Sequence, residues 1–244
     1  MKKIVIIQAR MASTRLPGKV LLDIAGEPML SRVITRVQQA QFPDEVVVAT
    51  STESSDDELA AFCSQHGWPC FRGSNLDVLD RFYHAASAFG GDVMVRVSSD
   101  CPLVDPDILD RVANALLNSS GTVDYAANML PPRTFPRGVD VEAFTFETLR
   151  KCWLEATAES HREHVTPYAY HNPELFRLAK VTNSTDESEY RWTVDAPEDL
   201  EIVRRICQKL PGTDFRCADV INVCQQHPEW SAINSHVQQK WWAA

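Results

Sequence analysis

Along the first half of the chain, short runs of apolar and β-branched residues alternate with segments whose apolar positions recur every three or four residues. The runs are typical of strands buried on both faces of a sheet, and the recurring positions predict helices. The expected strands cover 3–9, 45–50, 68–71 and 92–98. The expected helices cover 28–40, 56–66, 76–89 and 105–117. This alternation predicts a three-layer α/β fold, in which a mostly parallel sheet carries helices on both faces.

The second half of the chain is less regular. Further strands are expected at 123–128, 139–145, 176–181 and 190–194, and further helices at 146–157, 160–170, 197–210 and 218–226. A stretch rich in proline separates the first two of these strands, so we expect an inserted hairpin region over about 128–175. Because no linker is long enough to divide the chain, we expect a single domain over 1–244.

Composition narrows the class of protein. The 244 residues carry a formal net charge of −9 and 44% are hydrophobic, which is ordinary for a globular protein. The acidic balance argues against a nucleic-acid partner, and no apolar run reaches the ~20 residues of a membrane span. Arg10 ends a short apolar start that we interpret as a strand rather than an export signal, and the seven cysteines include no C-x-x-C pair. We therefore expect a cytoplasmic protein with reduced thiols and no membrane partner.

The segment after the first expected strand is basic. Five basic residues precede Asp23, the first acid of the chain: Lys2, Lys3, Arg10, Arg15 and Lys19. Ligands of α/β sheets bind at such strand ends, and arginine, lysine and loop amides suit phosphate oxygens. The spacing matches neither a Walker A loop nor a G-x-G-x-x-G motif. We predict a polyphosphate site here, with a solvated basic loop as the alternative.

Six segments in order carry a family resemblance: 6–19 (IIQARMASTRLPGK), 72–82, 96–103, 135–142, 162–168 and 191–200. They resemble the sugar-activating cytidylyltransferases, which include the CMP-Kdo and CMP-acylneuraminate synthetases, and fit the spore coat polysaccharide biosynthesis protein F group best. The resemblance implies a nucleotide-diphospho-sugar transferase-like fold. It also implies transfer of CMP from CTP to a sugar or sugar-acid acceptor, with release of pyrophosphate. Ala12 departs from the family, where we expect glycine; if that glycine served a positive φ, alanine would strain the loop.

The resemblance also implies the nucleotide-binding residues. They are Gln8, Ala9, Arg10, Ser13, Thr14, Arg15, Lys19, Arg72, Asp77 and Arg81. Arg10 and Lys19, together with Asp100, are implied to be catalytic. The alternative for Asp77 is that it merely begins a helix and favours its dipole.

A magnesium ion is the cofactor that the resemblance implies, held by Asp100 and Asp195. Each of these is expected at the end of a strand, two residues before a proline, so a shared sheet would bring both to one edge of the cleft. Mg²⁺ is typically held by one or two carboxylates with substrate phosphates. The alternative is that each aspartate caps the helix that follows it.

The acceptor side is assigned to the second half of the chain. We expect Arg137, Asp140, Glu142, Glu163 and His164 to face the acceptor. A buried ion-pair network that joins the hairpin to the next helix is the alternative.

We expect a homodimer formed through the hairpin region, and the C-terminal pair Trp241-Trp242 is of a kind that often packs on a neighbouring subunit. The alternative functions are a nucleotidyltransferase for another base, a nucleotide-sugar glycosyltransferase, and a non-catalytic nucleotide-binding scaffold protein.

Overall fold

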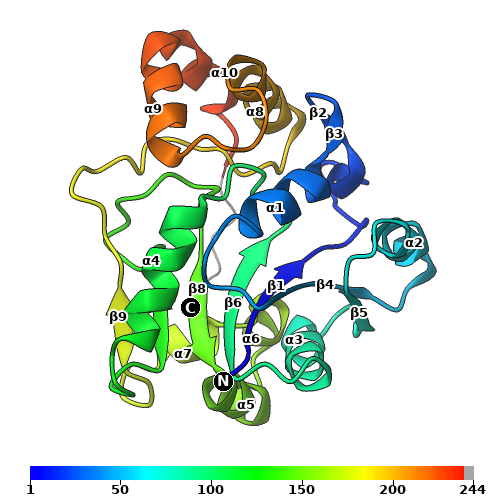
Figure 1. The fold of residues 1–244 in the computed structure, drawn as a ribbon, viewed down its shortest axis with the longest axis vertical. Helices are drawn as coiled ribbons and strands as arrows, with labels where there is room; N and C mark the ends of the chain where they lie inside the picture. The colour runs from blue at the N-terminus through cyan, green and yellow to red at the C-terminus, as the bar shows by residue number, and fades with distance from the viewer. Residues whose placement is uncertain (239–244) are drawn as a thin grey trace.

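The computed structural model describes residues 1–238, and within them a seven-stranded sheet forms the middle layer (Figure 1). Its strands lie in the order β5-β4-β1-β6-β8-β7-β9. They are β1 (Lys3–Gln8), β4 (Glu45–Ser51), β5 (Cys70–Gly73), β6 (Val93–Ser98), β7 (Tyr125–Ala127), β8 (Glu142–Thr145) and β9 (Leu178–Lys180). A small separate sheet pairs β2 (Asp23–Ile24) with β3 (Glu27–Pro28). The mostly parallel sheet expected from the alternation is confirmed.

Strand direction changes in the middle of the sheet. β1 lies between β4 and β6 and is parallel to both, and β5 continues the parallel half. β8 is antiparallel to β6 and to β7, while β7 is parallel to β9. β7 and β8, the strands on either side of the proline-rich stretch, complete the sheet between β6 and β9. In this register Arg96 of β6 lies opposite Glu142 of β8.

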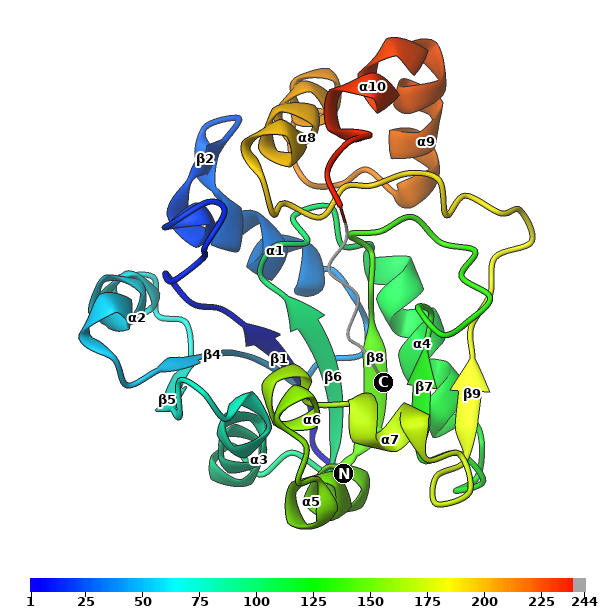
Figure 2. The same ribbon diagram turned by 180° about the vertical axis from the view of Figure 1, so that it is seen from behind.

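Helices cover both faces of the sheet (Figures 1 and 2). They are α1 (Met29–Val37), α2 (Asp57–Gln65), α3 (Val78–Ala88), α4 (Pro106–Leu117), α5 (Phe146–Glu155), α6 (Glu159–His164), α7 (Pro167–His171), α8 (Pro197–Lys209), α9 (Cys217–Gln226) and α10 (Ser231–Asn234). Short 3₁₀ turns occupy Lys19–Leu21, Ser54–Asp56 and Pro228–Trp230. Figure 1 looks onto the face covered by α1 and α4, and Figure 2 onto the face covered by α3, α5, α6 and α7.

The central strand β1 explains the uniform apolar run at the start of the chain. Val5 and Ile7 pack into the core that α1 and α4 share, whereas Ile4 and Ile6 pack into the core that α3 and α5 share. All four side chains are fully buried. A strand covered on both faces has no solvent side on which polar residues are tolerated, so polar side chains begin where the strand ends.

Two expected elements differ from the structure. Residues 190–194 form no strand; they contribute one bridge, between Arg137 and Arg191, and Gly138 with φ +101 lets the two backbones approach closely. The expected helix at 160–170 is two short helices, because Val165 between them has φ +73. The Trp241-Trp242 pair lies outside the described residues.

Candidate active site

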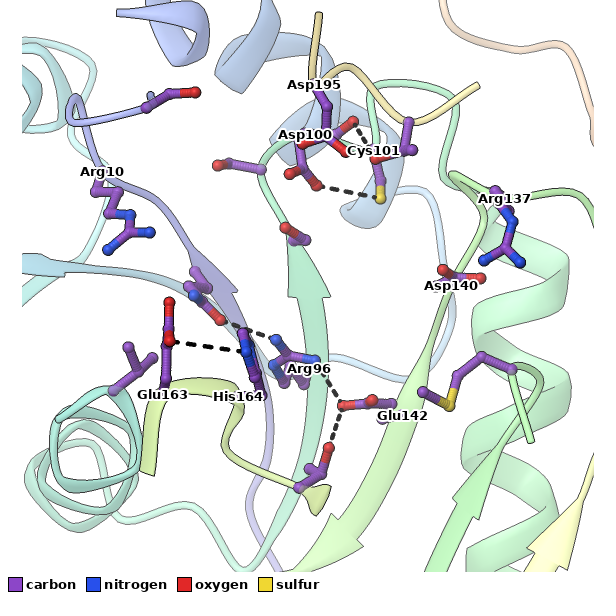
Figure 3. Close-up of a pocket in the computed structure, with 18 of the residues that line it drawn as sticks. Arg10, Arg96, Asp100, Cys101, Arg137, Asp140, Glu142, Glu163, His164 and Asp195 are labelled. Atoms are coloured by element: carbon purple, nitrogen blue, oxygen red, sulfur yellow. Dashed lines mark hydrogen bonds and ion pairs between the residues drawn. The ribbon is translucent and has the colours of Figure 1, made fainter. Parts of the chain in front are cut away.

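A cavity of about 690 Å³ opens at the edge of the sheet where β1 and β6 end and β8 begins (Figure 3). The loop after β1, the turn after β6 and the short helices α6 and α7 contribute to its wall. It brings together most of the predicted residues: Gln8, Arg10, Ser13, Thr14, Arg15, Lys19, Asp100, Arg137, Asp140, Glu142, Glu163, His164 and Asp195.

The basic loop is shaped by its own backbone. The amide of Gly18 donates to the carbonyl oxygen of Met11 over 2.9 Å, so residues 11–18 form a loop closed at its neck. Gly18 has φ +68, a left-handed conformation that glycine adopts without strain. Ala12 does not have a positive φ, so the strain anticipated at this departure from the family does not occur.

Lys19 links the two aspartates predicted to hold a metal. Its Nζ donates to Asp100 over 2.9 Å, to Asp195 over 3.0 Å and to the carbonyl oxygen of Val194 over 2.7 Å. Burial by itself would lower the pKa of Lys19, but the charges and hydrogen bonds of the two carboxylates raise it above its ordinary value. Burial opposes ionisation of Asp100 as well, yet Lys19 holds the pKa of that carboxyl below its usual range. Lys19 and Asp100 are therefore charged at neutral pH.

Asp195 receives cations from several parts of the chain. Its Oδ2 lies 3.0 Å from the guanidinium of Arg15 and 3.0 Å from that of Arg191. The expectation that Asp195 ends a strand is wrong, because residues 190–194 form only the isolated bridge of Arg191 with Arg137. A backbone hydrogen bond of 2.8 Å from the amide of Val194 to the carbonyl oxygen of Asp100 holds the segment beside the end of β6 instead.

Helix capping does not account for the two aspartates. α4 is capped by Asp105, whose carboxylate accepts from the amides of Asp107 and Ile108. At the start of α8, the carboxylate of Asp199 accepts from the amides of Asp195 and Ala196. The alternative of caps for these positions is therefore wrong, and both predicted carboxylates line the cavity.

The remaining predicted nucleotide residues, Ala9, Arg72, Asp77 and Arg81, do not line this cavity. Ala9 packs in the core, and Arg72 donates to the backbone carbonyls of Ser51, the last residue of β4, and Glu53. Asp77 caps α3 and pairs with an arginine of α6, which confirms the helix-start alternative for this residue. Arg81 is fully buried, and burial together with the charge of Arg10 lowers its pKa to about 10.

A buried ion pair lies on the floor of the cavity. Arg96 donates to Glu142 over 2.9 Å and to the side-chain oxygen of Gln8 over 3.0 Å, and the hydroxyl of Thr166 donates to the same carboxylate over 3.0 Å (Figure 3). Glu142 is only 3% exposed. The network joins β1, β6, β8 and the residue before α7, so the alternative of a buried ion-pair network is correct for Glu142, which also lines the cavity.

The loop between β7 and β8 adds further charge. Arg133 holds both carboxylate oxygens of Asp140. Arg137 lies close by, and burial, together with the positive charges of Arg133 and Arg191, lowers its pKa below the ordinary arginine value in spite of Asp140. Arg137 therefore lies at this end of the cavity beside the pair of Arg133 and Asp140.

Glu163 and His164 close α6 at the cavity wall (Figure 3). The Nε2 atom of His164 lies 3.8 Å from the Glu163 carboxylate. Burial and the positive charges of Arg96 and Arg10 lower the pKa of His164 to about 4, so this imidazole is neutral at pH 7. Val165, the residue that follows His164, has a left-handed φ that turns the chain at this point.

Sequence reasoning missed Arg96 and Arg133 as cavity residues. A signal existed for Arg96, because a charged side chain inside an otherwise apolar buried strand requires a partner. For Arg133 no feature of the proline-rich segment separated it from Arg137.

Comparison with known proteins shows the family of this chain. A family model described as cytidylyltransferase matches residues 4–216. The spore coat polysaccharide biosynthesis protein SpsF of Bacillus subtilis is 34% identical over 232 residues, 92% of this chain and 94% of that protein. A 3-deoxy-manno-octulosonate cytidylyltransferase of Geobacter sulfurreducens is 31% identical over 200 residues, 72% of this chain and 78% of that protein. The solved structure of a cytidylyltransferase from Leptospira borgpetersenii matches with a TM-score of 0.91 at 34% identity, over 99% of this chain and 100% of that one. The chain belongs to the cytidylyltransferase family.

Proposed function

We propose that this enzyme transfers CMP from CTP to the hydroxyl of a sugar or sugar acid, with release of pyrophosphate, for the synthesis of a surface polysaccharide. One observation carries the proposal: Lys19 meets Asp100 and Asp195 within 3.0 Å at the strand ends, beside the basic loop. Phosphoryl-type transfer depends on positioning and charge stabilisation more than on covalent chemistry, and this cluster supplies both.

The cations of the chain perform the electrostatic part of the reaction. Arg10, Arg15 and Lys19 line one side of the cavity, so a triphosphate against the loop meets all three. The arginines hold phosphate oxygens in pairs and the lysine adds a point charge. As the acceptor oxygen attacks the α-phosphate, negative charge grows on the leaving pyrophosphate. Cations already in place stabilise it without reorganisation.

The residues present fit a magnesium ion. Asp100 and Asp195 already share one cation, Lys19, and their oxygens are the hard ligands that Mg²⁺ prefers. Across residues 1–238 no group of three His, Cys, Asp or Glu side chains could hold a metal by itself. That suits Mg²⁺, which combines one or two carboxylates with substrate phosphates. Bound there, it would neutralise charge on the phosphates.

We assign the acceptor to the other end of the cavity, where Arg137, Asp140, Glu142, Glu163 and His164 lie. Guanidinium groups bind carboxylates through paired hydrogen bonds, so Arg137 in the cavity wall favours an acceptor that carries a carboxylate, and a sugar acid is preferred to a neutral sugar. The neutral imidazole of His164 is able to accept a hydrogen bond from an acceptor hydroxyl.

The proposal includes a homodimer in the cytoplasm, formed through residues 128–175. A twofold interface uses the same patch of both subunits. None of the described helices is both long and apolar enough to cross a membrane. We expect light scattering to give the mass of two chains at assay concentration, and the mass of one chain would contradict the dimer.

Pyrophosphate release tests the function. Purified enzyme with Mg²⁺ is incubated with CTP and a panel of sugar acids and neutral sugars, with ATP, GTP and UTP as matched nucleotides. We expect pyrophosphate only with CTP and an acceptor, and loss of the signal when EDTA removes the metal. Release with another nucleotide would reassign the base. Binding of CTP without release in any combination would favour the scaffold alternative, and sugar transfer from a nucleotide sugar would favour a glycosyltransferase.

A further inference from the structure

The neck of the nucleotide loop joins the two predicted catalytic cations. The Gly18 amide and the Met11 carbonyl close the loop, as described above. Arg10 immediately precedes this neck and Lys19 immediately follows it. The position of the neck therefore sets how far apart the two cations lie and which way each one points.

The Lys19 side of the neck is anchored within the cavity. Lys19 is held by Asp100, Asp195 and a backbone carbonyl, all within 3.0 Å. Within residues 1–238, no such anchor holds the side chain of Arg10 in the cavity. Its guanidinium faces the open space where phosphates are proposed to lie (Figure 3). Whatever holds Arg10 must therefore act on its backbone.

Asp56 acts on that backbone from outside the cavity. It ends the 3₁₀ turn that follows β4, is 1% exposed and does not line the cavity. One carboxylate oxygen accepts from the amide of Met11 over 2.7 Å. The other accepts from the amide of Ser51 over 3.0 Å and also from the Ser51 hydroxyl. A buried carboxylate that lies 45 residues away in sequence thus ties the loop neck to the end of β4.

Charge supports the same role. Burial would raise the pKa of Asp56, but the hydrogen bonds from Ser51 and Met11 hold it below its ordinary value, so the carboxylate is ionised at neutral pH. The fully buried Arg81 interacts with both Arg10 and Asp56. Asp56 therefore places a negative charge near the buried Arg81, behind the loop.

We infer that Asp56 is a positioning residue for the nucleotide: it fixes the Met11 amide, and through it directs Arg10 toward the phosphates. The kinetic consequence rests on the proposed reaction with CTP, whereas the placement of the loop does not. A displacement of about 1 Å at a reacting group is able to cost roughly 100-fold in rate, so a residue that never meets substrate is able to matter this much.

Asp105 offers a matched control. It is also 1% exposed, and its carboxylate also accepts from several backbone amides, those of Asp107, Ile108 and Cys217. None of these belongs to the nucleotide loop. Asp56→Ala and Asp105→Ala therefore remove equivalent buried carboxylates, and only the first releases the loop.

The experiment measures kcat/KM for CTP by pyrophosphate release, well below the melting temperature of each variant. We expect Asp56→Ala to lose about 10–100-fold and Asp105→Ala to stay within about 3-fold of the wild type, although both melt at a lower temperature. If Asp56→Ala does not fold, Asp56→Asn against Asp105→Asn gives the same comparison with a smaller loss. Equal kcat/KM values in the two aspartate variants would overturn the inference.

Hydrogen exchange gives a readout that is independent of the reaction. In Asp56→Ala without nucleotide, we expect faster exchange at the amides of Met11 and Gly18, with no change there in Asp105→Ala. Unchanged exchange at both amides would overturn the placement of the loop by Asp56. A wild type that does not use CTP would overturn the proposed function, while the exchange data would still decide the role of Asp56.

Discussion

The two ends of the cavity hold their charges in different ways. At the nucleotide end, Arg15, Lys19 and Arg191 share the carboxylate of Asp195, and Lys19 also serves Asp100. At the acceptor end, Arg96 and Glu142 form a pair in which the carboxylate is almost completely buried. Cations that are shared between partly exposed carboxylates are able to exchange a carboxylate for a phosphate without leaving an uncompensated charge. A buried pair has no such freedom, because removing one partner leaves the other charge uncompensated.

Because of this difference, neutralising a carboxylate should produce opposite results at the two ends of the cavity. Neutralising a carboxylate of the nucleotide end is expected to cost turnover and little stability. Neutralising the buried carboxylate of the acceptor end is expected to lower the free energy of unfolding. The following substitutions test this contrast in order of expected effect.

Asp100→Asn is expected to have the largest effect on the reaction. The amide keeps the size of the side chain but removes the charge that Lys19 and the proposed metal require. Turnover should fall at least ~100-fold, the scale of one strong electrostatic contribution in an active site. Lys19 keeps its contacts with Asp195 and Val194, so the melting temperature should change little. Pyrophosphate release and thermal unfolding on the same sample check both statements, and near-normal turnover would break the contrast.

Glu142→Gln should instead act on the free energy of unfolding. The amide leaves the charge of Arg96 unbalanced in a buried place, and the expected loss is about 1–3 kcal/mol. Urea unfolding followed by circular dichroism measures it. Glu163→Gln is the control, because Glu163 is half exposed at the same wall and should lose less than about 0.5 kcal/mol. Equal losses in the two variants would show that burial of Glu142 is not what matters.

Lys19→Ala and Arg15→Ala compare two cations of the nucleotide end by their contribution to CTP binding. Lys19 is 12% exposed and holds two carboxylates, whereas Arg15 is 31% exposed and pairs with one. Binding of CTP, measured by calorimetry, should weaken by about 2 kcal/mol for Lys19→Ala and about 1 kcal/mol for Arg15→Ala, within the range for charged hydrogen bonds. Wild-type affinity for CTP in both variants would show that the loop does not bind the nucleotide.

His164 should give the smallest effect, through pH. Its pKa is about 4 in the folded protein, below the ordinary value of 6.5. Between these values the unfolded chain binds the proton more readily, so stability is complete above about pH 6.5 and falls as the pH drops toward 4. Because part of the imidazole is in contact with solvent, which screens the neighbouring charges, we expect a loss of less than about 1 kcal/mol in the free energy of unfolding between pH 7 and pH 5. His164→Gln should flatten this dependence, and an unchanged slope would assign the pH dependence to other groups.

Most of the parallel half could be predicted from sequence, because a strand such as β1 buries both faces and leaves no polar position to obscure it. The location of Asp195 in the site was correct although its predicted strand was not. Which segment pairs with which is decided by contacts far apart in sequence, here Val194 with Asp100 and Trp192 with Arg137. Periodicity along the chain does not contain those contacts.

The prediction of one continuous helix over 160–170 is wrong for a different reason. Its apolar positions continue across Val165, and a β-branched residue gives no warning of a left-handed φ. Similarly, Arg72 and Asp77 carried the right residue types for a nucleotide site but are engaged in local backbone and helix-end contacts. Side-chain direction, which separates a cavity residue from a structural one, is settled by packing between elements.

The ion pair between Lys19 and Asp195 spans 176 residues of sequence. At a synthesis rate of roughly 5–20 residues per second, Asp195 is made about 10–35 s after Lys19. During that interval β1, β4, β5 and β6 are all available to pair on the ribosome, while Lys19 meets Asp100 without its second carboxylate. The nascent chain thus carries much of its parallel sheet well before it carries a complete site, and catalytic competence waits for the segment that contains Asp195.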